Sequence, residues 1–204
     1  MEKAYPYMDD SLGNVISSRF EQACQVNNLK LDVVDLTQLH APVTPLVEFH
    51  REMYPNRSNI EDWIDECRQH VGSRAIVLYD RETPERLAAC CLLKPPTVQD
   101  IGGGAENLVR DAQDRLGVAL ANKIYCNSLA VAPRLRGAGI APGLTWTARN
   151  LLRQPQGAVY FSRISPENYA SMRAAKKTGR ASTGIYDSET KKYIWWGVIP
   201  PANP

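Results

Sequence analysis

The sequence predicts a single α/β domain, built on a mixed, mostly antiparallel central sheet that is flanked by helices. The order of the patterns is a strand, two helices, two strands, then strand and helix in alternation, and a last strand. A glycine-rich turn joins one of the later strands to its helix. The 204 residues, with 44% hydrophobic composition, suffice for one packed core and are short for two.

The first half of the chain supplies the elements up to a hairpin. Helical spacing of apolar residues behind a loose lead predicts an N-terminal helical extension, about residues 1–28, and alternation predicts a half-buried first strand. The predicted helices lie at 14–25, 43–54 and 59–71. The predicted strands lie at 29–36, 74–79 and 86–93, the last two joined by the turn DRETPE.

The second half begins with an insertion at about 95–122, between the third and fourth strands. Its triple glycine at 102–104 predicts a hinge, and 106–116 predicts a helix, so the segment is either a lid or partner surface, or a surface decoration. The later predicted strands lie at 124–131, 158–164 and 193–199, with a hairpin turn DSET before the last. The later predicted helices lie at 143–152 and 166–179.

Composition narrows the class of protein. The 24 basic and 22 acidic residues give a net charge of +2, so neither nucleic acid nor a membrane surface is an expected partner. No apolar run reaches the ~18 residues that span a bilayer, and no leader is recognisable, which predicts a soluble, cytoplasmic protein. The five cysteines are scattered without zinc-ligand spacing, which predicts reduced, mostly buried thiols and no metal site.

The turn RLRGAGIA at 134–141 is the most informative motif. A strand that enters a glycine-rich turn and then a helix directs several backbone N–H groups at one point, with the positive end of the helix dipole behind them. Gly137 and Gly139 allow positive φ, and Arg136 adds a positive charge. A triphosphate loop would need Gly-Lys-Ser or Gly-Lys-Thr, and a Rossmann turn would need a small residue at Leu144. The turn therefore predicts a phosphate or pyrophosphate site.

Two motifs follow each other in the second half of the chain. The first is formed by Val131, Pro133, Arg136, Gly137, Gly139, Ile140 and Ala141, and the second, a strand-helix unit, by Asn168, Ser171, Lys177 and Gly179. They resemble the acyl-CoA pyrophosphate loop and the strand-helix unit after it in the GNAT-type N-acetyltransferase superfamily. The resemblance is detailed over about residues 124–179 and architectural elsewhere.

The resemblance implies a sheet splayed between its fourth and fifth strands and an acetyltransferase that uses acetyl-CoA. The acetyl group would pass to an amine of a protein or small molecule by direct attack in a ternary complex, with an amide near Leu129 or Ala130 polarising the thioester carbonyl. Helices 43–71 and the final hairpin would bind the acceptor, and their acidic residues would suit a cation if they faced inward. The implied acyl-CoA contacts are Leu129, Ala130, Val131, Arg136, Gly137, Ala138, Gly139, Ile140, Ala141, Asn168 and Lys177.

The usual proton-handling residues of the family are absent. Its helix tyrosine falls on Ala175, its strand carboxylate on Asn127 and its closing aromatic on Arg180. Asn127 could order a water that accepts the proton of the amine. The other candidate bases are Tyr125, Glu48, Glu52 and His50, and the candidate acids are Ser171 and Tyr169. Each candidate base also has a non-catalytic interpretation. Tyr125 could be a core aromatic, the glutamates could lie on a solvated helix face, and His50 could simply be exposed. Cys126 reads as a buried structural thiol rather than a nucleophile.

These absences keep a second class of function open. The chain could be a catalytically weak or inactive scaffold that binds acyl-CoA or a protein partner in a regulatory role. A pure interaction module without acyl-CoA is a third alternative. The predicted partners are acyl-CoA and an amine acceptor, with a homodimer as an open alternative.

Overall fold

The computed structural model describes residues 6–38, 43–116, 122–151, 153 and 157–201. Its strands form one seven-stranded sheet in the order β1-β2-β3-β4-β5-β7-β6. Strands β4 and β5 are parallel, whereas the β1–β2, β2–β3, β5–β7 and β6–β7 pairs are antiparallel. The predicted mixed, mostly antiparallel sheet is confirmed.

The chain divides into two compact units, each described by itself below. The first comprises Met1–Asn14, Pro96–Cys126 and Arg149–Pro204, and the second Val15–Pro95 and Asn127–Ala148. The β4–β5 ladder runs from Asn122↔Ala158 to Cys126↔Ser162. It therefore ends where β4 passes from the first unit to the second.

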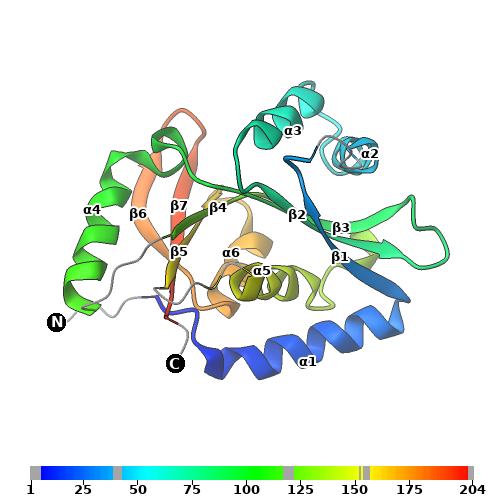
Figure 1. Cartoon of the computed structure of the whole chain (residues 1–204), viewed down its shortest axis with the longest axis horizontal. Coiled ribbons are helices and arrows are strands. Elements are labelled where there is room, and N and C mark those ends of the chain that lie inside the picture. The colour runs from blue at the N-terminus through cyan, green and yellow to red at the C-terminus, as the bar shows by residue number, and fades with distance from the viewer. Residues whose placement is uncertain (1–5, 39–42, 117–121, 152, 154–156, 202–204) are drawn as a thin grey trace. The chain divides into compact units, whose positions relative to one another are not determined.

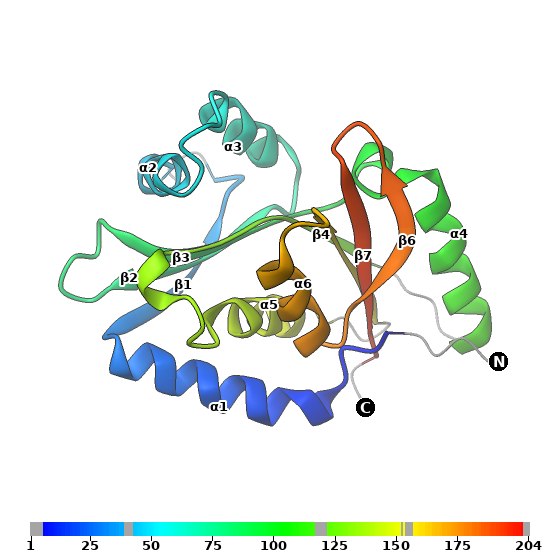
Figure 2. The same ribbon diagram turned by 180° about the vertical axis from the view of Figure 1, so that it is seen from behind.

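Helices lie on both sides of the strands in the second unit. Its elements are most of α1 (Asp10–Val26), β1 (Leu29–Asp35), α2 (Thr44–Met53), α3 (Ile60–Gln69), β2 (Arg74–Asp80), β3 (Leu87–Lys94), the end of β4 (Asn122–Val131), the short helix η1 (Pro133–Leu135) and most of α5 (Ile140–Leu151). Helices α2 and α3 lie on one side of strands β1–β3, and α1 and α5 on the other (Figures 1 and 2).

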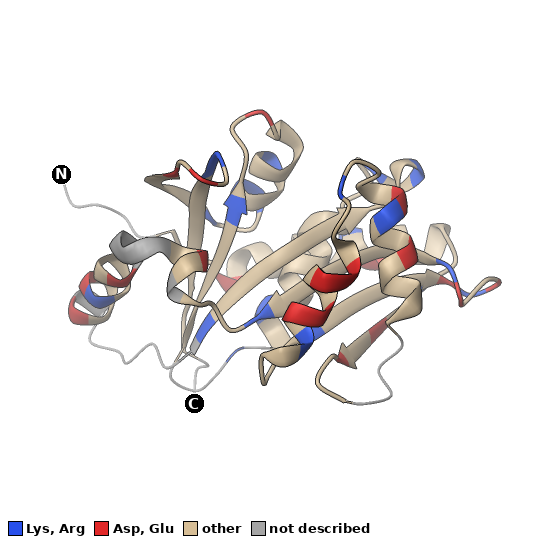
Figure 3. Ribbon diagram, turned by 90° about the horizontal axis from the view of Figure 1, so that it is seen from above, with Lys and Arg blue, Asp and Glu red and all other residues tan. Residues whose placement is uncertain are grey.

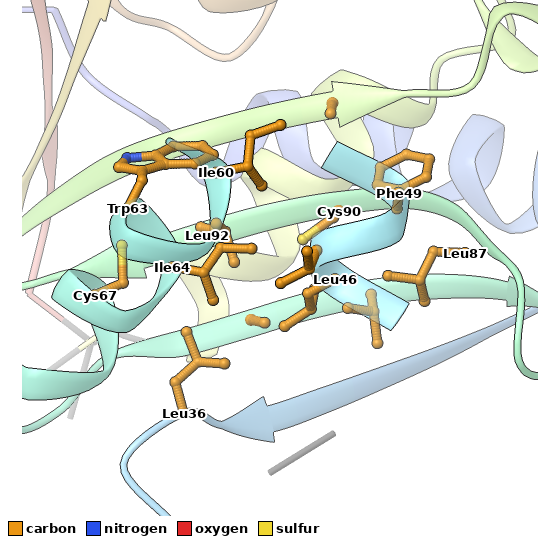
Figure 4. Packing of buried hydrophobic residues seen from close by; sticks show 14 of the residues in the cluster. Leu36, Leu46, Phe49, Ile60, Trp63, Ile64, Cys67, Leu87, Cys90 and Leu92 are labelled. Atoms are coloured by element: carbon orange, nitrogen blue, oxygen red, sulfur yellow. The ribbon is translucent and has the colours of Figure 1, made fainter. Parts of the chain in front are cut away.

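The core of the second unit fills the space between helices α2 and α3 and the sheet. Leu46 and Phe49 of α2 and Ile64 of α3 point toward β3, which is buried along its whole length (Figure 4). Strand β1 is more exposed than its alternation predicts, because Leu31 and Val33 each keep 38% of their surface. The strand ends the sheet order and pairs with β2 alone, so fewer neighbours cover it.

The first unit contains the insertion as helix α4 (Val98–Leu116), with β5 (Ala158–Ile164), α6 (Tyr169–Lys177), β6 (Ala181–Asp187) and β7 (Lys192–Ile199). Helix α4 lies beside β6 (Figures 1 and 2). Its Ile101 and Val109 are buried in a cluster with Phe161 and Trp196 of the sheet. The insertion thus contributes to the core of its unit, which neither a lid nor a surface decoration requires.

The prediction that the triple glycine forms a hinge is wrong, because 102–104 lie inside α4. A reciprocal cap sets the start of the helix. The Asp100 amide donates to Thr97 Oγ1 at 3.2 Å, and the Thr97 amide donates to Asp100 Oδ2 at 2.7 Å. Such a cap satisfies amides that a helix start leaves unpaired, and with burial of the apolar face it offsets the low helix propensity of glycine.

No helix in the described part of the chain combines the length and the apolar character that crossing a lipid bilayer requires.

Candidate functional site

The residues 136–141, called the glycine turn below, connect η1 to α5. The amide of Leu135 donates to the Ala132 carbonyl at 2.9 Å, which closes the turn of η1. Gly137 and Gly139 then adopt φ values of 85° and 89°. These angles lie in the left-handed region that L side chains rarely occupy, so the conformation requires glycine, as the sequence predicts.

Four backbone amides of the glycine turn have no acceptor among the described residues. They belong to Gly137, Gly139, Ile140 and Ala141. The next position, Pro142, has no N–H, and the amide of Gly143 donates to the Gly139 carbonyl at 3.1 Å. Unpaired amides at a helix start, with the helix dipole behind them, form an anion-binding concavity.

Arginines surround the glycine turn. Arg136 is exposed, and its Nε donates to the Val131 carbonyl at 3.3 Å. Arg134 pairs loosely with Asp80, with 3.7 Å between Nη2 and Oδ2. Arg19 of α1 is also close, since its Cβ is 3.8 Å from where a Cβ on Gly139 would lie. The positive charge of Arg136 favours an anion, and the approach of α1 at Arg19 is a contact that the local motif could not predict.

The end of β4 supplies the residues predicted to hold the pantetheine arm. Leu129 and Val131 are half-buried, whereas Ala130 is buried in the core beside α2 and α3. The Val131 carbonyl accepts one bond from Arg136 and has a second lone pair for a ligand. The amide of Ala132 donates to the Ala88 carbonyl at 2.9 Å and ties this end of β4 to β3.

Asn127 is the first residue of β4 that belongs to the second unit. Its Nδ2 donates to Cys67 Sγ on α3 at 2.8 Å, and its side chain is half-buried. An amide held in this way is positioned by the protein rather than by solvent. Cys67 lies 60 residues earlier in the chain, so no sequence spacing could have linked the two.

His50 is completely buried, so the alternative that it is simply exposed is wrong. Its Nδ1 lies 2.7 Å from the Leu46 carbonyl, and its Nε2 lies 3.1 Å from Ser128 Oγ. The ring also packs edge-on against Trp63 at 5.2 Å and stacks near Tyr54 at 6.0 Å. Burial, the main cause, holds the pKa of His50 below its usual value. Sequence reasoning missed Ser128, which is 78 residues from His50.

The acidic residues of α2 and α3 do not face inward. Glu48 and Glu52 are exposed, and Glu52 lies 3.9 Å from Arg86. Glu61 pairs with Arg51 at 2.7 Å. Both charge signs appear on these helices, which are nearest the viewer in Figure 3. This placement fits the interpretation of the two glutamates as part of a solvated helix face. A cationic acceptor is expected only if the acidic residues face inward, and they do not.

The remaining candidates lie in the first unit. Tyr125 is buried in the cluster of α4 and the sheet, where a core aromatic belongs, and its proton-handling role stays a prediction. Asn168 Oδ1 accepts from the Ser171 amide at 3.0 Å and caps α6, which explains why the helix begins at Tyr169 rather than near 166. Lys177 is exposed in the last turn of α6, Ser171 is half-buried and Tyr169 is exposed.

Two departures from the family pattern have clear structural consequences. Ala175 is fully buried beside Ile164 and Trp195, so no hydroxyl stands at the tyrosine position. Arg180 is buried at the position of the closing aromatic. Its guanidinium lies 4.8 Å from the centre of the Tyr160 ring and donates to Ser162 Oγ at 3.0 Å. Stacking on an aromatic face lets this cation fill an apolar position.

The cysteines do not form a reactive cluster in the described residues. None of the five cysteines forms a disulfide; four are buried, and Cys24 is half-buried. Burial, the main cause, raises the pKa of Cys24. No group of three or more His, Cys, Asp or Glu side chains within the described ranges is arranged to hold a metal ion.

Comparison with known proteins supports the fold. No family model matches the sequence. No curated protein sequence matches it either. Solved structures do match: NAA60 of Arabidopsis thaliana in complex with a bisubstrate analogue is 15% identical, with a TM-score of 0.57, covering 85% of this chain and 99% of that one.

Two further structures agree. The ribosomal-protein-S18-alanine N-acetyltransferase of Escherichia coli is 9% identical, with a TM-score of 0.55, over 86% of this chain and 96% of that one. NAA60 with acetyl-CoA is 16% identical, with a TM-score of 0.56, over 83% and 97%. The chain therefore has a GNAT-type fold, and identities this low show the fold alone.

Proposed function

We propose that the chain is an acetyl-CoA-dependent N-acetyltransferase. The observation that carries the proposal is the glycine turn, where four unpaired amides and Arg136 meet at the start of α5. A pyrophosphate supplies the acceptor oxygens and the negative charge that this arrangement lacks. The neighbours in fold include one solved with acetyl-CoA, which supports the same donor here.

The proposed reaction is direct attack by an amine on the acetyl thioester. The nitrogen lone pair forms a bond to the carbonyl carbon, the carbon–sulfur bond breaks, and the thiolate leaves. An amide at Leu129 or Ala130 would donate to the carbonyl oxygen as it gains negative charge, which typically lowers the barrier by about 3 kcal/mol. Holding the two reactants together supplies several kcal/mol more.

The first unit adds proposed contacts and proton carriers. Asn168 keeps its amide nitrogen as a donor while its oxygen caps α6, and Lys177 offers a cation for the nucleotide part of acyl-CoA. Ser171 is the candidate acid for the leaving thiolate, and Tyr125 and Asn127 are candidates for relaying the proton of the amine. Acceptor binding near α2, α3 and the β6–β7 hairpin is part of the same proposal.

A catalytically weak scaffold is the second candidate. Two observations favour it. Ala175 is buried and offers no acid, and Asn127, at the position of the usual carboxylate, is bonded to Cys67. Such a protein would keep the glycine turn and bind acyl-CoA without turnover.

Calorimetry with acetyl-CoA, followed by a thiol-release assay with mixed amine acceptors, tests both candidates. The acceptor set should include peptides with a free α-amino group, peptides with internal lysine, and polyamines. Binding together with acceptor-dependent thiol release supports the enzyme. Binding with no release above background for any acceptor supports the scaffold, and no binding at all rejects both.

A further inference from the structure

The pair formed by Ser128 and His50, called the serine–histidine pair below, is positioned from both sides. Ser128 belongs to β4, directly before Leu129 and Ala130, whose amides are the candidates for polarising the thioester, and His50 belongs to α2. Nε2 of the ring lies 3.1 Å from the hydroxyl oxygen, while Nδ1 lies 2.7 Å from the Leu46 carbonyl. This is the geometry of a hydroxyl, a base and a group that orients the base.

The hydrogen bond to Leu46 determines which ring nitrogen carries the proton. A carbonyl oxygen only accepts, so Nδ1 of His50 must donate to it. In the neutral ring Nε2 then has a lone pair, and the hydroxyl of Ser128 donates to it. The serine proton is therefore already directed at the base.

The two members of the pair differ slightly in accessibility. His50 keeps 0% of its surface and Ser128 keeps 6%. Because solvent does not reach the ring, the Ser128 hydroxyl that contacts Nε2 gives a proton a hydrogen-bonded route to it. Helix α2, which carries His50, is also one of the elements proposed to bind the acceptor.

Few charged or titratable groups face the ring. On its own helix Tyr54 stacks near it, and the α2–α3 connection contributes Arg57, whose charge acts in the same direction as burial. Phe49 and Trp63, which also pack against the ring, carry no charge, and Glu48 and Glu52 of the same helix are exposed. The ring is thus neutral near pH 7, as a proton acceptor must be.

We propose that Ser128 and His50 form a proton relay that serves the acetyl transfer. The inference rests on the proposed function and supplies the base that the Asn127 position lacks. The hydroxyl oxygen of Ser128 accepts a proton from the attacking ammonium as its own proton passes to Nε2 of His50. The amine then attacks the thioester, and its nitrogen loses a second proton to water as the amide forms. The same relay run in reverse returns the first proton to the thiolate as the carbon–sulfur bond breaks.

The pair Ser128→Thr and Ser128→Val tests the relay. The two side chains have the same shape, and only threonine keeps the hydroxyl. We expect Thr to retain activity and Val to lose about 100-fold in kcat, within the usual range for general base catalysis. Equal kcat values for the two variants overturn the relay.

Histidine variants separate catalysis from structure. His50→Gln keeps an acceptor near Nε2 but cannot take up a proton at neutral pH. We expect it to bind acetyl-CoA with unchanged affinity, to lose kcat, and to lack an acid limb of kcat/KM that the wild type shows below the usual histidine pKa of about 6.5. A variant with the wild-type rate and pH profile contradicts the proposal.

Two further measurements complete the test. Nitrogen NMR of the wild-type protein should show the Nδ1–H tautomer of His50, and an Nε2–H tautomer overturns the relay whether or not the protein is an enzyme. Mass spectrometry with acetyl-CoA and no acceptor should find Ser128 unmodified, and an acetyl-serine would replace the relay with a covalent mechanism. A wild-type protein that releases no thiol refutes the proposed function, whereas an active wild type with unaffected variants refutes the relay alone.

Discussion

The glycine turn and the serine–histidine pair differ in where their polar groups come from. The turn offers backbone amides from consecutive residues, and those amides lack partners in the described structure. The pair consists of side chains from α2 and β4, and both ring nitrogens and the hydroxyl oxygen already take part in hydrogen bonds. One region is built to receive a ligand from outside, and the other is built to move a proton inside the protein.

This difference predicts how the two regions respond to substitution. A backbone site is insensitive to most side-chain changes, but a charge or a backbone shift at the turn affects every amide together. A side-chain relay can be removed by one substitution without affecting the donor site. Binding and turnover should therefore separate cleanly among variants.

The largest effect is expected for Gly139→Asp, with Gly139→Asn as its control. Among the described residues a Cβ at Gly139 meets only Arg19, at 3.8 Å, and the strain that φ of 89° imposes on an L residue is common to both variants, so it cancels in their comparison. The aspartate adds a negative charge beside the pyrophosphate. We expect the Kd for acetyl-CoA to rise at least about 100-fold for Asp and less than about tenfold for Asn, measured by calorimetry. Equal affinities of the two variants would show that the turn does not bind the phosphates.

A smaller effect is expected for Gly143→Ala, which tests the support of the turn. A Cβ here would overlap the Phe20 ring of α1, with the Phe20 Cβ only 2.7 Å away. Overpacking of this kind costs about 1–3 kcal/mol in the free energy of unfolding, and relief by moving α5 would displace the amides. Chemical denaturation and acetyl-CoA titration should show losses of both stability and affinity. Ala138→Gly, at an exposed position of the same turn, serves as the control for local flexibility.

The sequence predicts the two regions unequally. The glycine turn depends on neighbouring residues, so the requirement for glycine at Gly137 and Gly139 could be inferred before the fold was known. The pair depends on contacts across 78 residues, and the Asn127–Cys67 bond on contacts across 60. No local pattern encodes such contacts, so the sequence marks His50 as a candidate base without indicating Ser128 as its partner.

Helix α4 shows the same limit at the level of the fold. Glycines at 102–104 lower local helix propensity and suggested a hinge. The helix forms because Thr97 and Asp100 cap it and because Ile101 and Val109 bury against the sheet. The cap was readable in the sequence as Thr-x-x-Asp, whereas the burial that completes the argument was not.

A modest effect is expected for Arg136→Ala, with Arg51→Ala on α2 as the control. Arg136 is exposed and would pair with a phosphate in water, where ion pairs contribute about 1 kcal/mol or less. We expect affinity for acetyl-CoA to fall about threefold to fivefold in low salt and less in high salt, because salt screens the charge. An unchanged affinity at low salt would assign the binding to the amides alone.

The smallest effect concerns stability rather than binding, and it isolates the serine–histidine pair. The folded-state pKa of His50 is lowered, chiefly by burial, so below the unfolded-state value of about 6.5 the unfolded chain takes up a proton that the folded protein resists. Stability attributable to the neutral ring is present above that pH and is lost as pH falls toward the lowered pKa. Between pH 7.5 and 5 the thermal midpoint of the wild type should fall more than that of His50→Gln.

The lowered carboxyl pKa values of Asp35 and Asp187 act at more acidic pH and are common to both proteins, so they cancel in the difference. Parallel pH dependences would mean that the ring is as easily protonated in the folded protein as in the unfolded chain, and a ring of that kind would not be the sealed base that the relay requires.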